Sequence, residues 1–518
     1  MRGGGGTGVL SQVQSFGLAG IDGFPVTVEA YVADGLPMFE LVGLPDAAVR
    51  EARERVRAAM QQTGFTFPIA RTTVNLAPAD VKKEGPAYDL SIALSLLAAS
   101  GQIDGAGLSG RIVLGELALG GRVTQVRGAL PMVIGARALG YREAMIPAEN
   151  AQEVACVDGI RIVPVESLRQ AVDHVTGAKP IEPIVPVPYE RLLTERRPAQ
   201  DLSAVRGQRS AKRALEIAAA GGHNVLMVGP PGAGKTMLAR CLPGILPDMT
   251  FEEALEATRI HSAAGQLAPG EGLLRERPFR APHHTASAAA LVGGGPKARP
   301  GEISLASGGV LFLDELPEYN RAALEAMRQP LEDGFVSVVR VAAQARYPAR
   351  VMLVAAMNPC PCGHYGAEDQ QCRCTQREIR RYLDRVSGPL LDRIDMQLEV
   401  TSVPVADIAG GAREESSSAV RARVEAARRV QGERYAGEGI GCNAQLSAGQ
   451  LERYCPLGAD AKELLHRAVQ KYKLSMRAYS RVLKVARTIA DLAATDITAA
   501  HIAEAVRYRS IDEKYWGG

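Results

Sequence analysis

The feature that most restricts the fold of this chain is the segment Gly229–Thr236, which reads Gly-Pro-Pro-Gly-Ala-Gly-Lys-Thr. It matches the pattern G-x-x-x-x-G-K-[ST], follows an apolar run at Val225–Val228 and precedes a helical segment. Such a loop turns backbone N–H groups toward phosphate oxygens, and the N-terminus of the following helix adds partial positive charge. We therefore predict an α/β domain with a nucleotide-phosphate site at this loop. A chance glycine-rich turn is the alternative.

Every residue of this loop is a predicted nucleotide contact. Lys235 is expected at the β- and γ-phosphates, and the Thr236 hydroxyl is expected to hold Mg²⁺. The predicted contacts are Gly229, Pro230, Pro231, Gly232, Ala233, Gly234, Lys235 and Thr236. ATP and Mg²⁺ are therefore the predicted cofactors.

Two carboxylates at the end of a second apolar run, Val310–Leu313, supply the rest of this site. A run without alternation is typical of a strand buried on both faces of a parallel sheet, and ligands bind beyond the carboxyl ends of such strands. Asp314 is expected to bind Mg²⁺ through water, and Glu315 to orient and polarise the attacking water. Asn358, at the end of a third such run, is expected to reach the γ-phosphate. The alternatives are a solvated acid pair and a turn-capping asparagine.

Length, composition and net charge indicate the general class of protein. The chain has 518 residues, a net charge of +3 and 46% hydrophobic residues, which suits a soluble protein of about three domains. A net charge of +3 argues against a surface that is positive all over, but it is compatible with a local basic channel. The sequence shows neither a secretion signal nor an apolar stretch of ~20 residues. We expect a cytoplasmic protein without a membrane partner.

Changes in composition predict four regions. Residues 1–178 alternate strand-like and helix-like patterns, and residues 179–200 form a proline-rich linker. Residues 201–403 carry the three apolar runs and the intervening helices of a doubly wound parallel sheet. Residues 404–518 have helical composition and are expected to form an all-helical lid.

Four of the eight cysteines lie in an insertion at 360–374 within the third region. They are Cys360, Cys362, Cys372 and Cys374. Thiolates bind Zn²⁺ tetrahedrally, so four of them would close a structural site and leave no position open for catalysis. The C-x-C spacing departs from the commoner C-x₂-C, and His364 is a substitute ligand if one cysteine fails. We predict a structural zinc site, with reduced and unmetallated thiols as the alternative.

Several segments together resemble the magnesium-chelatase-like AAA+ proteins, and most closely the ComM (YifB) subfamily. They are Gly229–Thr236, Arg280–Thr285, Leu291–Gly295, Pro300–Ser304, Gly309–Leu316, Asn358–Gly363 and Arg487–Leu492. With the N-terminal region also fitting, the resemblance covers nearly the whole chain. It implies an AAA+ P-loop fold with a helical lid and a homo-hexameric ring around single-stranded or branched DNA. It also implies an ATP-driven helicase that promotes branch migration during natural transformation.

The resemblance assigns roles to residues outside the loop. Arg393, in the segment Pro389–Asp395, resembles an arginine finger that would act on the nucleotide of a neighbouring subunit. A surface Asp–Arg pair is its alternative. Arg477 is the candidate for the second sensor arginine, and Arg481 is its rival.

Two pore loops are implied as well, one around Ala286–Lys297 and one hairpin with strands near Phe335–Val341 and Tyr347–Leu353. Phosphate contacts from such loops would give sequence-independent, salt-sensitive binding, which suits a motor that moves along any sequence. The candidate DNA contacts are Lys297, Arg340 and Arg346. An ordinary surface charge is the alternative for each.

The first region resembles the Lon-type protease domain, with its α+β fold of the ribosomal S5 domain 2-like kind. The matching segments are Lys83–Tyr88, Gly115–Arg122 and Ile146–Asn150. In this resemblance Ala87 stands at the position of the nucleophilic serine and Leu130 at that of the lysine. Because a Ser–Lys dyad needs an oxygen nucleophile and an amine, we predict a protease fold without proteolysis. A DNA or partner platform and a pure scaffold are the two roles left open.

Other functions compete with the DNA motor. The ATPase subunit of a metal chelatase is one, although the D-x-S-x-S pentapeptide of the integrin-type partner domain is absent from this sequence. Remodelling of a protein partner is another. An ATP-dependent protease is disfavoured because Ala87 and Leu130 remove the dyad.

Overall fold

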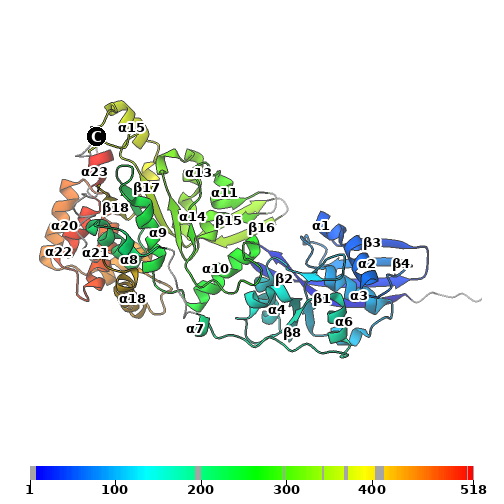
Figure 1. The fold of residues 1–518 in the computed structure, drawn as a ribbon. Helices are drawn as coiled ribbons and strands as arrows, with labels where there is room; N and C mark the ends of the chain where they lie inside the picture. The colour runs from blue at the N-terminus through cyan, green and yellow to red at the C-terminus, as the bar shows by residue number, and fades with distance from the viewer. Residues whose placement is uncertain are drawn as a thin grey trace, which may run out of the picture.

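The computed structural model describes residues 8–192, 200–295, 298–340, 343–366, 371–402, 414–509 and 511–516. Figure 1 shows the N-terminal region (residues 8–178, blue to cyan) at one end of an elongated chain and the C-terminal region (residues 414–516, orange to red) at the other. The central region (residues 200–402) lies between them. Within the described ranges, none of the helices combines the length and the apolar character needed to cross a bilayer.

The N-terminal region is built on a seven-stranded mixed sheet with the order β3-β4-β2-β1-β5-β8-β9. Its strands are β1 (Val9–Ala19), β2 (Asp22–Ala33), β3 (Met38–Val42), β4 (Arg71–Ala77), β5 (Arg111–Val113), β8 (Glu143–Pro147) and β9 (Arg161–Val165), with a small hairpin of β6 (Glu116–Leu117) and β7 (Val123–Thr124). Alternating burial along β4 matches a sheet with one face on the core. Its helices are α1 (Ala47–Arg50), α2 (Ala52–Gln62), α3 (Asp89–Ala99), α4 (Ala129–Ala138), α5 (Ala151–Val154) and α6 (Leu168–Val175). The predicted mixed α/β character is confirmed.

The predicted linker, residues 179–200, first contacts the N-terminal region and then the central region. The N–H of Ile184 donates to the carbonyl of Ile162 over 2.8 Å, and a short helix, α7 (Tyr189–Leu192), follows. The Tyr189 hydroxyl donates to the carbonyl of Met249 over 2.9 Å, so this end of the linker is fixed to the central region. Residues 193–199 of the linker lie outside the described residues.

The central region holds a five-stranded parallel sheet with the order β11-β14-β17-β10-β18. The strands are β10 (Val225–Val228), β11 (Phe279–Arg280), β14 (Val310–Leu313), β17 (Met352–Met357) and β18 (Met396–Glu399). Every residue of β10, β14 and β17 is buried, which confirms the strands predicted from runs without alternation. The accompanying elements are α8 (Arg209–Gly221), α9 (Lys235–Ile245), α10 (Phe251–Ala264), α11 (Ala288–Val292), β12 (Gly293–Gly294), β13 (Arg299–Pro300), α12 (Glu302–Leu305), α13 (Arg321–Ala326), α14 (Arg328–Asp333), α15 (Gln376–Leu383) and α16 (Gly388–Leu391).

The predicted hairpin is present, but its second strand was placed wrongly, and its role as a pore loop stays a prediction. The hairpin pairs β15 (Phe335–Arg340) with β16 (Ala343–Pro348), and Tyr347 lies opposite Val336. Strand β16 ends at Pro348. The N–H of the next residue, Ala349, donates to the carbonyl of Gly334, and β17 then begins at Met352 in the parallel sheet. Strand propensity cannot separate two consecutive strands that pair with different partners, and this explains the error.

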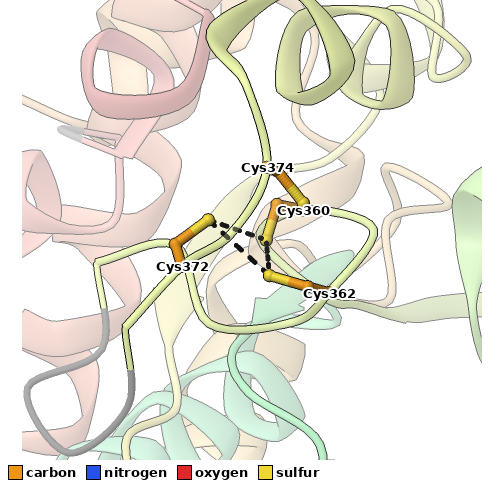
Figure 2. Close-up of side chains that lie close together, drawn as sticks. All are labelled: Cys360, Cys362, Cys372 and Cys374. Carbon is orange, nitrogen blue, oxygen red and sulfur yellow. Dashed lines mark hydrogen bonds between the residues drawn. The ribbon is translucent and has the colours of Figure 1, made fainter.

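After β17 the chain enters the cysteine-rich insertion. Figure 2 shows the four cysteine side chains converging from two segments of this loop. Residues 367–370 of the loop lie outside the described residues.

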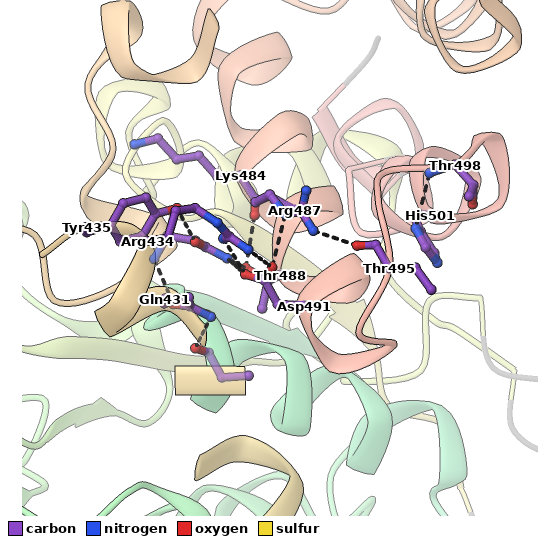
Figure 3. A network of polar contacts seen from close by, with 12 residues as sticks. Gln431, Arg434, Tyr435, Lys484, Arg487, Thr488, Asp491, Thr495, Thr498 and His501 are labelled. Carbon is purple, nitrogen blue, oxygen red and sulfur yellow. Dashed lines mark hydrogen bonds and ion pairs between the residues drawn. The ribbon is translucent and has the colours of Figure 1, made fainter. Parts of the chain in front are cut away.

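The C-terminal region is helical, as predicted, and contains α18 (Ser417–Arg434), α19 (Ala448–Tyr454), α20 (Ala459–Lys471), α21 (Met476–Leu492), α22 (Ala499–Arg507) and α23 (Ile511–Trp516). Its centre is a polar network around the buried Asp491 carboxylate (Figure 3). Arg434 reaches this carboxylate with two nitrogens, at 2.6 and 3.0 Å, and Arg487 reaches it at 3.0 Å. The neighbouring Thr488 hydroxyl lies 2.8 Å from Nε2 of His223, which precedes β10. The network therefore connects the helical region to the sheet.

Helix α10 of the central region docks on helix α4 of the N-terminal region. The buried carboxylate of Glu153 accepts hydrogen bonds from the N–H of Leu130 and from the hydroxyl of Ser262 on α10. Arg259, also on α10, donates to the carbonyl of Ile21 over 3.0 Å. These contacts place the turn between β1 and β2 against the central region.

Candidate active site

The loop Gly229–Thr236 connects β10 to α9, as predicted. Gly234 is the N-cap of α9 and, like Gly232, has a left-handed φ (+89° and +77°) with open space where a side chain would point. A Cβ on Gly229 would lie 2.0 Å from the carbonyl oxygen of Val400, so only glycine fits beside β18. The glycines are therefore needed for different reasons. Gly229 allows close packing against the backbone, and Gly232 and Gly234 give the loop its left-handed turns at the helix N-terminus.

The Lys235 ammonium group folds back over this loop. Its Nζ donates to the carbonyl oxygens of Gly229 and Pro230, over 2.6 and 2.9 Å, and to Oδ1 of Asn358 over 3.1 Å. Burial lowers the pKa of Lys235 to about 8, although the charges of Asp314 and Glu315 act in the opposite direction. The structure therefore brings together the predicted lysine and the predicted asparagine from two neighbouring strands.

The predicted magnesium ligands also meet. The Thr236 hydroxyl donates to Oδ2 of Asp314 over 2.7 Å, and the N–H of Glu315 donates to Oδ1 of the same carboxylate over 3.0 Å. A hydroxyl and a carboxylate are oxygen ligands of the kind that Mg²⁺ prefers, so these residues fit the ion. Thr236 and Asp314 would hold it.

Glu315 has a partner that the sequence analysis did not identify. Oε2 of Glu315 lies 3.2 Å from Nδ1 of His284, which precedes α11. Glu315 also has left-handed backbone geometry, with φ +52°. The signal was present in the sequence, because His284 belongs to the segment Arg280–Thr285, to which no role was assigned.

The four insertion cysteines have the geometry of a metal site. All four sulfur atoms lie within 4.8 Å of one another, and those of Cys360, Cys362 and Cys372 are separated by 3.3 to 3.7 Å. Four sulfurs bound to Zn²⁺ at about 2.3 Å in a tetrahedron would lie about 3.8 Å apart. The residues therefore fit a zinc ion.

This insertion packs on the phosphate loop. Gly363 has φ +84°, and a Cβ there would lie 2.5 Å from Cδ of Pro231. Its N–H donates to the carbonyl of Cys360 over 3.0 Å. A rigid cysteine cluster would therefore support one wall of the nucleotide site.

The predicted arginines each pair with a carboxylate of their own chain. Arg393 pairs with Glu332 and donates to the carbonyl of Pro389 over 3.2 Å. The Arg477 side chain is 61% exposed, and its Nη1 lies 3.3 Å from Oδ2 of Asp392. Arg481 is only 13% exposed, and its Nε lies 3.3 Å from Asp395. Arg481 is thus held by a buried carboxylate, and the choice between Arg477 and Arg481 as the second sensor stays a prediction.

Of the three predicted DNA contacts, the structure describes the side chain of Arg346 alone. Lys297 lies outside the described residues, and so does the side chain of Arg340 at the end of β15. Arg346 is exposed on β16, with its guanidinium carbon 3.6 Å from the centre of the Phe335 ring. Its role stays a prediction.

A cavity of about 930 Å³ opens beside the turn that follows Glu315. It is lined by Pro317, Glu318, Tyr319, Arg321, Arg377, Glu378, Arg380, Arg381, Asp384 and Arg385. Arginines outnumber carboxylates in this lining, so the cavity favours anions.

The parallel sheet, the loop after β10 and the carboxylates after β14 together define a P-loop nucleotide-binding protein. Comparison with known proteins agrees. Residues 201–408 match the family model described as magnesium chelatase, subunit ChlI, residues 28–150 match subunit ChlI of Mg-chelatase, and residues 414–509 match the ChlI C-terminal model.

Among individual relatives, competence protein ComM of Haemophilus influenzae is 44% identical over 505 residues, covering 97% of this chain and 98% of the relative. Protein YifB of Escherichia coli is 44% identical over 505 residues, covering 97% of each. The chain therefore belongs to the ComM/YifB subfamily of magnesium-chelatase-like proteins.

A third relative bears on the N-terminal region. Lon protease 2 of Bacillus subtilis is 26% identical over 107 residues, covering 20% of this chain and 19% of the relative. Ala87 and Leu130 both lie in one buried apolar cluster, against which Leu255 of α10 packs. Aliphatic side chains therefore fill the positions at which the Lon resemblance expects serine and lysine.

Proposed function

We propose that this protein is a ring-forming AAA+ ATPase that uses ATP hydrolysis to move along DNA and promotes branch migration of recombining DNA, as in natural transformation. The observation that carries the ATPase assignment is the meeting of Lys235, Thr236, Asp314 and Asn358 beside Glu315 at one edge of the sheet. The competence role is supported by the name of the Haemophilus relative.

Each residue has a defined task in this reaction. Lys235 leaves its own loop carbonyls to pair with the β- and γ-phosphates, and the loop N–H groups bind phosphate oxygens. Mg²⁺, when bound, neutralises charge on the phosphates. Glu315 orients the water, and Asn358 contacts the γ-phosphate. In a hexamer, Arg393 of the neighbouring subunit offsets the charge of the transferring phosphoryl group.

DNA contact is assigned to positive surfaces of the central region. The proposed contacts are Lys297, Arg340 and Arg346, with single-stranded or branched DNA in the pore. The arginine-lined cavity at 317–321 and 377–385 is a separate candidate surface for phosphates, because guanidinium groups bind phosphates in a bidentate manner.

Two finer assignments complete the proposal. The insertion cysteines hold one structural Zn²⁺. The N-terminal region has a Lon-protease-like fold without proteolysis, supported by the 26% identity to Lon protease 2 over 107 residues and by the aliphatic Ala87 and Leu130.

The decisive experiment measures ATP hydrolysis with and without single-stranded or branched DNA, together with displacement of an annealed strand. We expect DNA to stimulate hydrolysis and the wild-type protein to displace the strand. Glu315→Gln should still bind ATP but lose at least about 100-fold in turnover, because general base catalysis contributes that much or more. A verified hexamer with neither DNA stimulation nor strand displacement would overturn the DNA motor. Stimulation by a porphyrin-binding partner would favour a chelatase instead.

A further inference from the structure

The cavity beside the turn that follows Glu315 has walls from two segments that are far apart in the sequence. One wall is the segment 317–321, which comes soon after β14, and the other wall is α15 with the residues that follow it. The cavity has a volume of about 930 Å³. Figure 1 shows α15 apart from the β15–β16 hairpin, so the cavity is separate from the predicted pore hairpin. The proposed mechanism of ATP hydrolysis uses none of its arginines.

The lining combines five arginines with three carboxylates, and two of these carboxylates already have partners. Oε2 of Glu318 lies 2.8 Å from Nη1 of Arg385, and this ion pair joins the two walls. Glu378 completes a capping box at the start of α15, where its carboxylate accepts a hydrogen bond from the N–H of Thr375 over 2.8 Å. The third carboxylate is that of Asp384, the C-cap residue of α15. Positive charge therefore dominates the cavity.

Three of the arginines, Arg321, Arg377 and Arg381, are exposed and have no carboxylate within ion-pairing distance in the part of the chain that the structure describes. Helix stability does not account for this arrangement. Arg321 is the first residue of α13 and Arg377 is the second residue of α15, and the helix dipole disfavours a cation in the first turn. Arg377 and Arg381 are also four residues apart on one helix, where like charges repel. A bound anion would offset both effects.

The arrangement favours a chain of phosphates over a single small anion. Arg377 and Arg381 are separated by about 6 Å along the helix axis, since each residue of an α-helix rises about 1.5 Å. Guanidinium groups bind phosphate oxygens through two parallel N–H donors. The aromatic side chain of the described lining, Tyr319, is buried and donates its hydroxyl to the carbonyl of Pro282, so it offers no free ring for stacking on a base. Contacts to phosphates alone bind any sequence.

Both walls are attached to the nucleotide site. Helix α15 begins shortly after Cys374, the last cysteine of the insertion, and its Ile379 and Leu383 side chains are buried in the same core as Leu313 of β14. The other wall follows Glu315 along the chain. The backbone that carries the arginines is therefore held by packing before a ligand binds, which lowers the entropic cost of binding.

We propose that the cavity between α15 and the segment 317–321 binds the phosphodiester backbone of a DNA strand, with Arg321, Arg377 and Arg381 as the phosphate contacts. This inference rests on the proposed function and adds a DNA site separate from the predicted pore contacts. The strand is held by its phosphates, so binding at this site is independent of sequence and sensitive to salt.

The test measures binding of a fluorescein-labelled single-stranded oligonucleotide of mixed sequence by anisotropy over a range of KCl concentrations. Each phosphate contact on a single strand adds about 0.7 to the steepness with which log affinity falls with log salt concentration. The double substitution Arg377→Gln and Arg381→Gln should therefore reduce this slope by about 1.4, and Arg321→Gln on the other wall should reduce it by about 0.7. Lysine at 377 and 381 keeps both charges and should keep the slope while it weakens binding, because lysine cannot bind phosphate in a bidentate manner.

A matched control is the double substitution Arg467→Gln and Lys471→Gln. These two exposed residues have the same four-residue spacing on α20, so the control removes the same charge from another helix and should leave the slope unchanged. Melting temperatures show whether each variant is folded, and Arg321→Gln decides the question if the double variant of α15 does not fold.

Equal slopes for the wild type and the cavity variants overturn the inference. If those variants also lose binding of inorganic phosphate, measured by calorimetry, the cavity is a site for a free anion. If they instead form smaller assemblies in ATP, measured by sedimentation, the cavity is a contact between subunits. A wild type that binds no DNA at any salt concentration contradicts the DNA motor as well, whereas a wild type that binds DNA with a slope equal to that of the variants contradicts this inference alone.

Discussion

At the scale of single residues, the charged groups of the predicted nucleotide site have partners within the chain. Lys235 is only 8% exposed, and its ammonium group is held by two loop carbonyls and by Asn358. Because these partners are neutral dipoles, a triphosphate is a stronger partner and replaces them. The buried position has a cost, since it brings the pKa of Lys235 close to the physiological range.

This pKa leads to a prediction about pH. With a pKa of about 8, Lys235 is charged at pH 7 and loses its proton as the pH rises through 8. Because the charged form binds phosphate, nucleotide affinity should fall above pH 8, by up to about tenfold per pH unit. The dissociation constant of a fluorescent ATP analogue, measured from neutral to alkaline pH, would show this. Lys235→Arg keeps its charge and should lose the slope, so an equal slope in both proteins would assign the titration to another group.

At the scale of elements, two loops and one helix decide how the site is held. In the cysteine insertion, Gly363 packs against Pro231 of the phosphate loop. In loop 281–287, the His284 side chain lies beside that of Glu315. Helix α21 carries the polar network that connects the lid to His223. The segment Arg487–Leu492 therefore organises the lid itself, which gives a structural reason for one of the motifs behind the family resemblance.

The insertion gives a prediction about metal content. Wild-type protein should carry about one zinc ion per chain, and Cys362→Ser should carry none, because a structural site needs all of its ligands. Elemental analysis of purified protein is the measurement. Cys156→Ser changes a half-buried cysteine outside the cluster and should keep its zinc. Zinc-free wild-type protein that folds normally in the presence of a chelator would contradict the assignment.

The lid network gives a prediction about stability. Asp491→Ala removes the common partner of Arg434 and Arg487, which are only 20% and 6% exposed. Unpaired buried charges are costly, so we expect a loss of about 3–5 kcal/mol and a clearly lower melting temperature.

A matched control for this variant is Glu463→Ala. Glu463 pairs with Arg467 at 3.7 Å on the exposed face of α20, where both side chains are about 70% exposed. Such pairs contribute roughly 0–1 kcal/mol. If both variants melt at the same temperature as the wild type, the Asp491 network does not stabilise the lid.

At the scale of the whole molecule, the central region is fixed on both sides. Helix α10 is bound to the N-terminal region through Ser262 and Glu153, and the lid is bound to the sheet through Thr488 and His223. Arg393 pairs with Glu332 of its own chain. Under the proposed function, a neighbouring subunit supplies this arginine to the nucleotide.

Mixed assemblies test this directly. Arg393→Ala alone should bind ATP normally and lose roughly 10³-fold or more in turnover. Mixing it with Glu315→Gln should restore part of the activity, because some interfaces then combine an intact glutamate with an intact neighbouring arginine. If the mixture is as inactive as each variant alone, Arg393 does not act in trans.

Much of the site could be predicted because its signals are local. A phosphate loop needs glycines, a lysine and a hydroxyl at fixed spacing, so Gly229–Thr236 identified the nucleotide site and Asp314 its partner. Buried parallel strands also have a local signature in runs such as Val310–Leu313, which the structure confirms. The sequence by itself thus determined the class of sheet and the residues at its carboxyl edge.

Only the tertiary structure decided the relations between distant segments. The pairing of His284 with Glu315 depends on β11 lying beside β14, and the contact of Gly363 with Pro231 depends on how the insertion folds back. The hairpin was misplaced for the same reason, since β16 and β17 differ in their partners rather than in their composition. Such contacts join residues far apart along the chain, and their energy depends on packing geometry that no local pattern records.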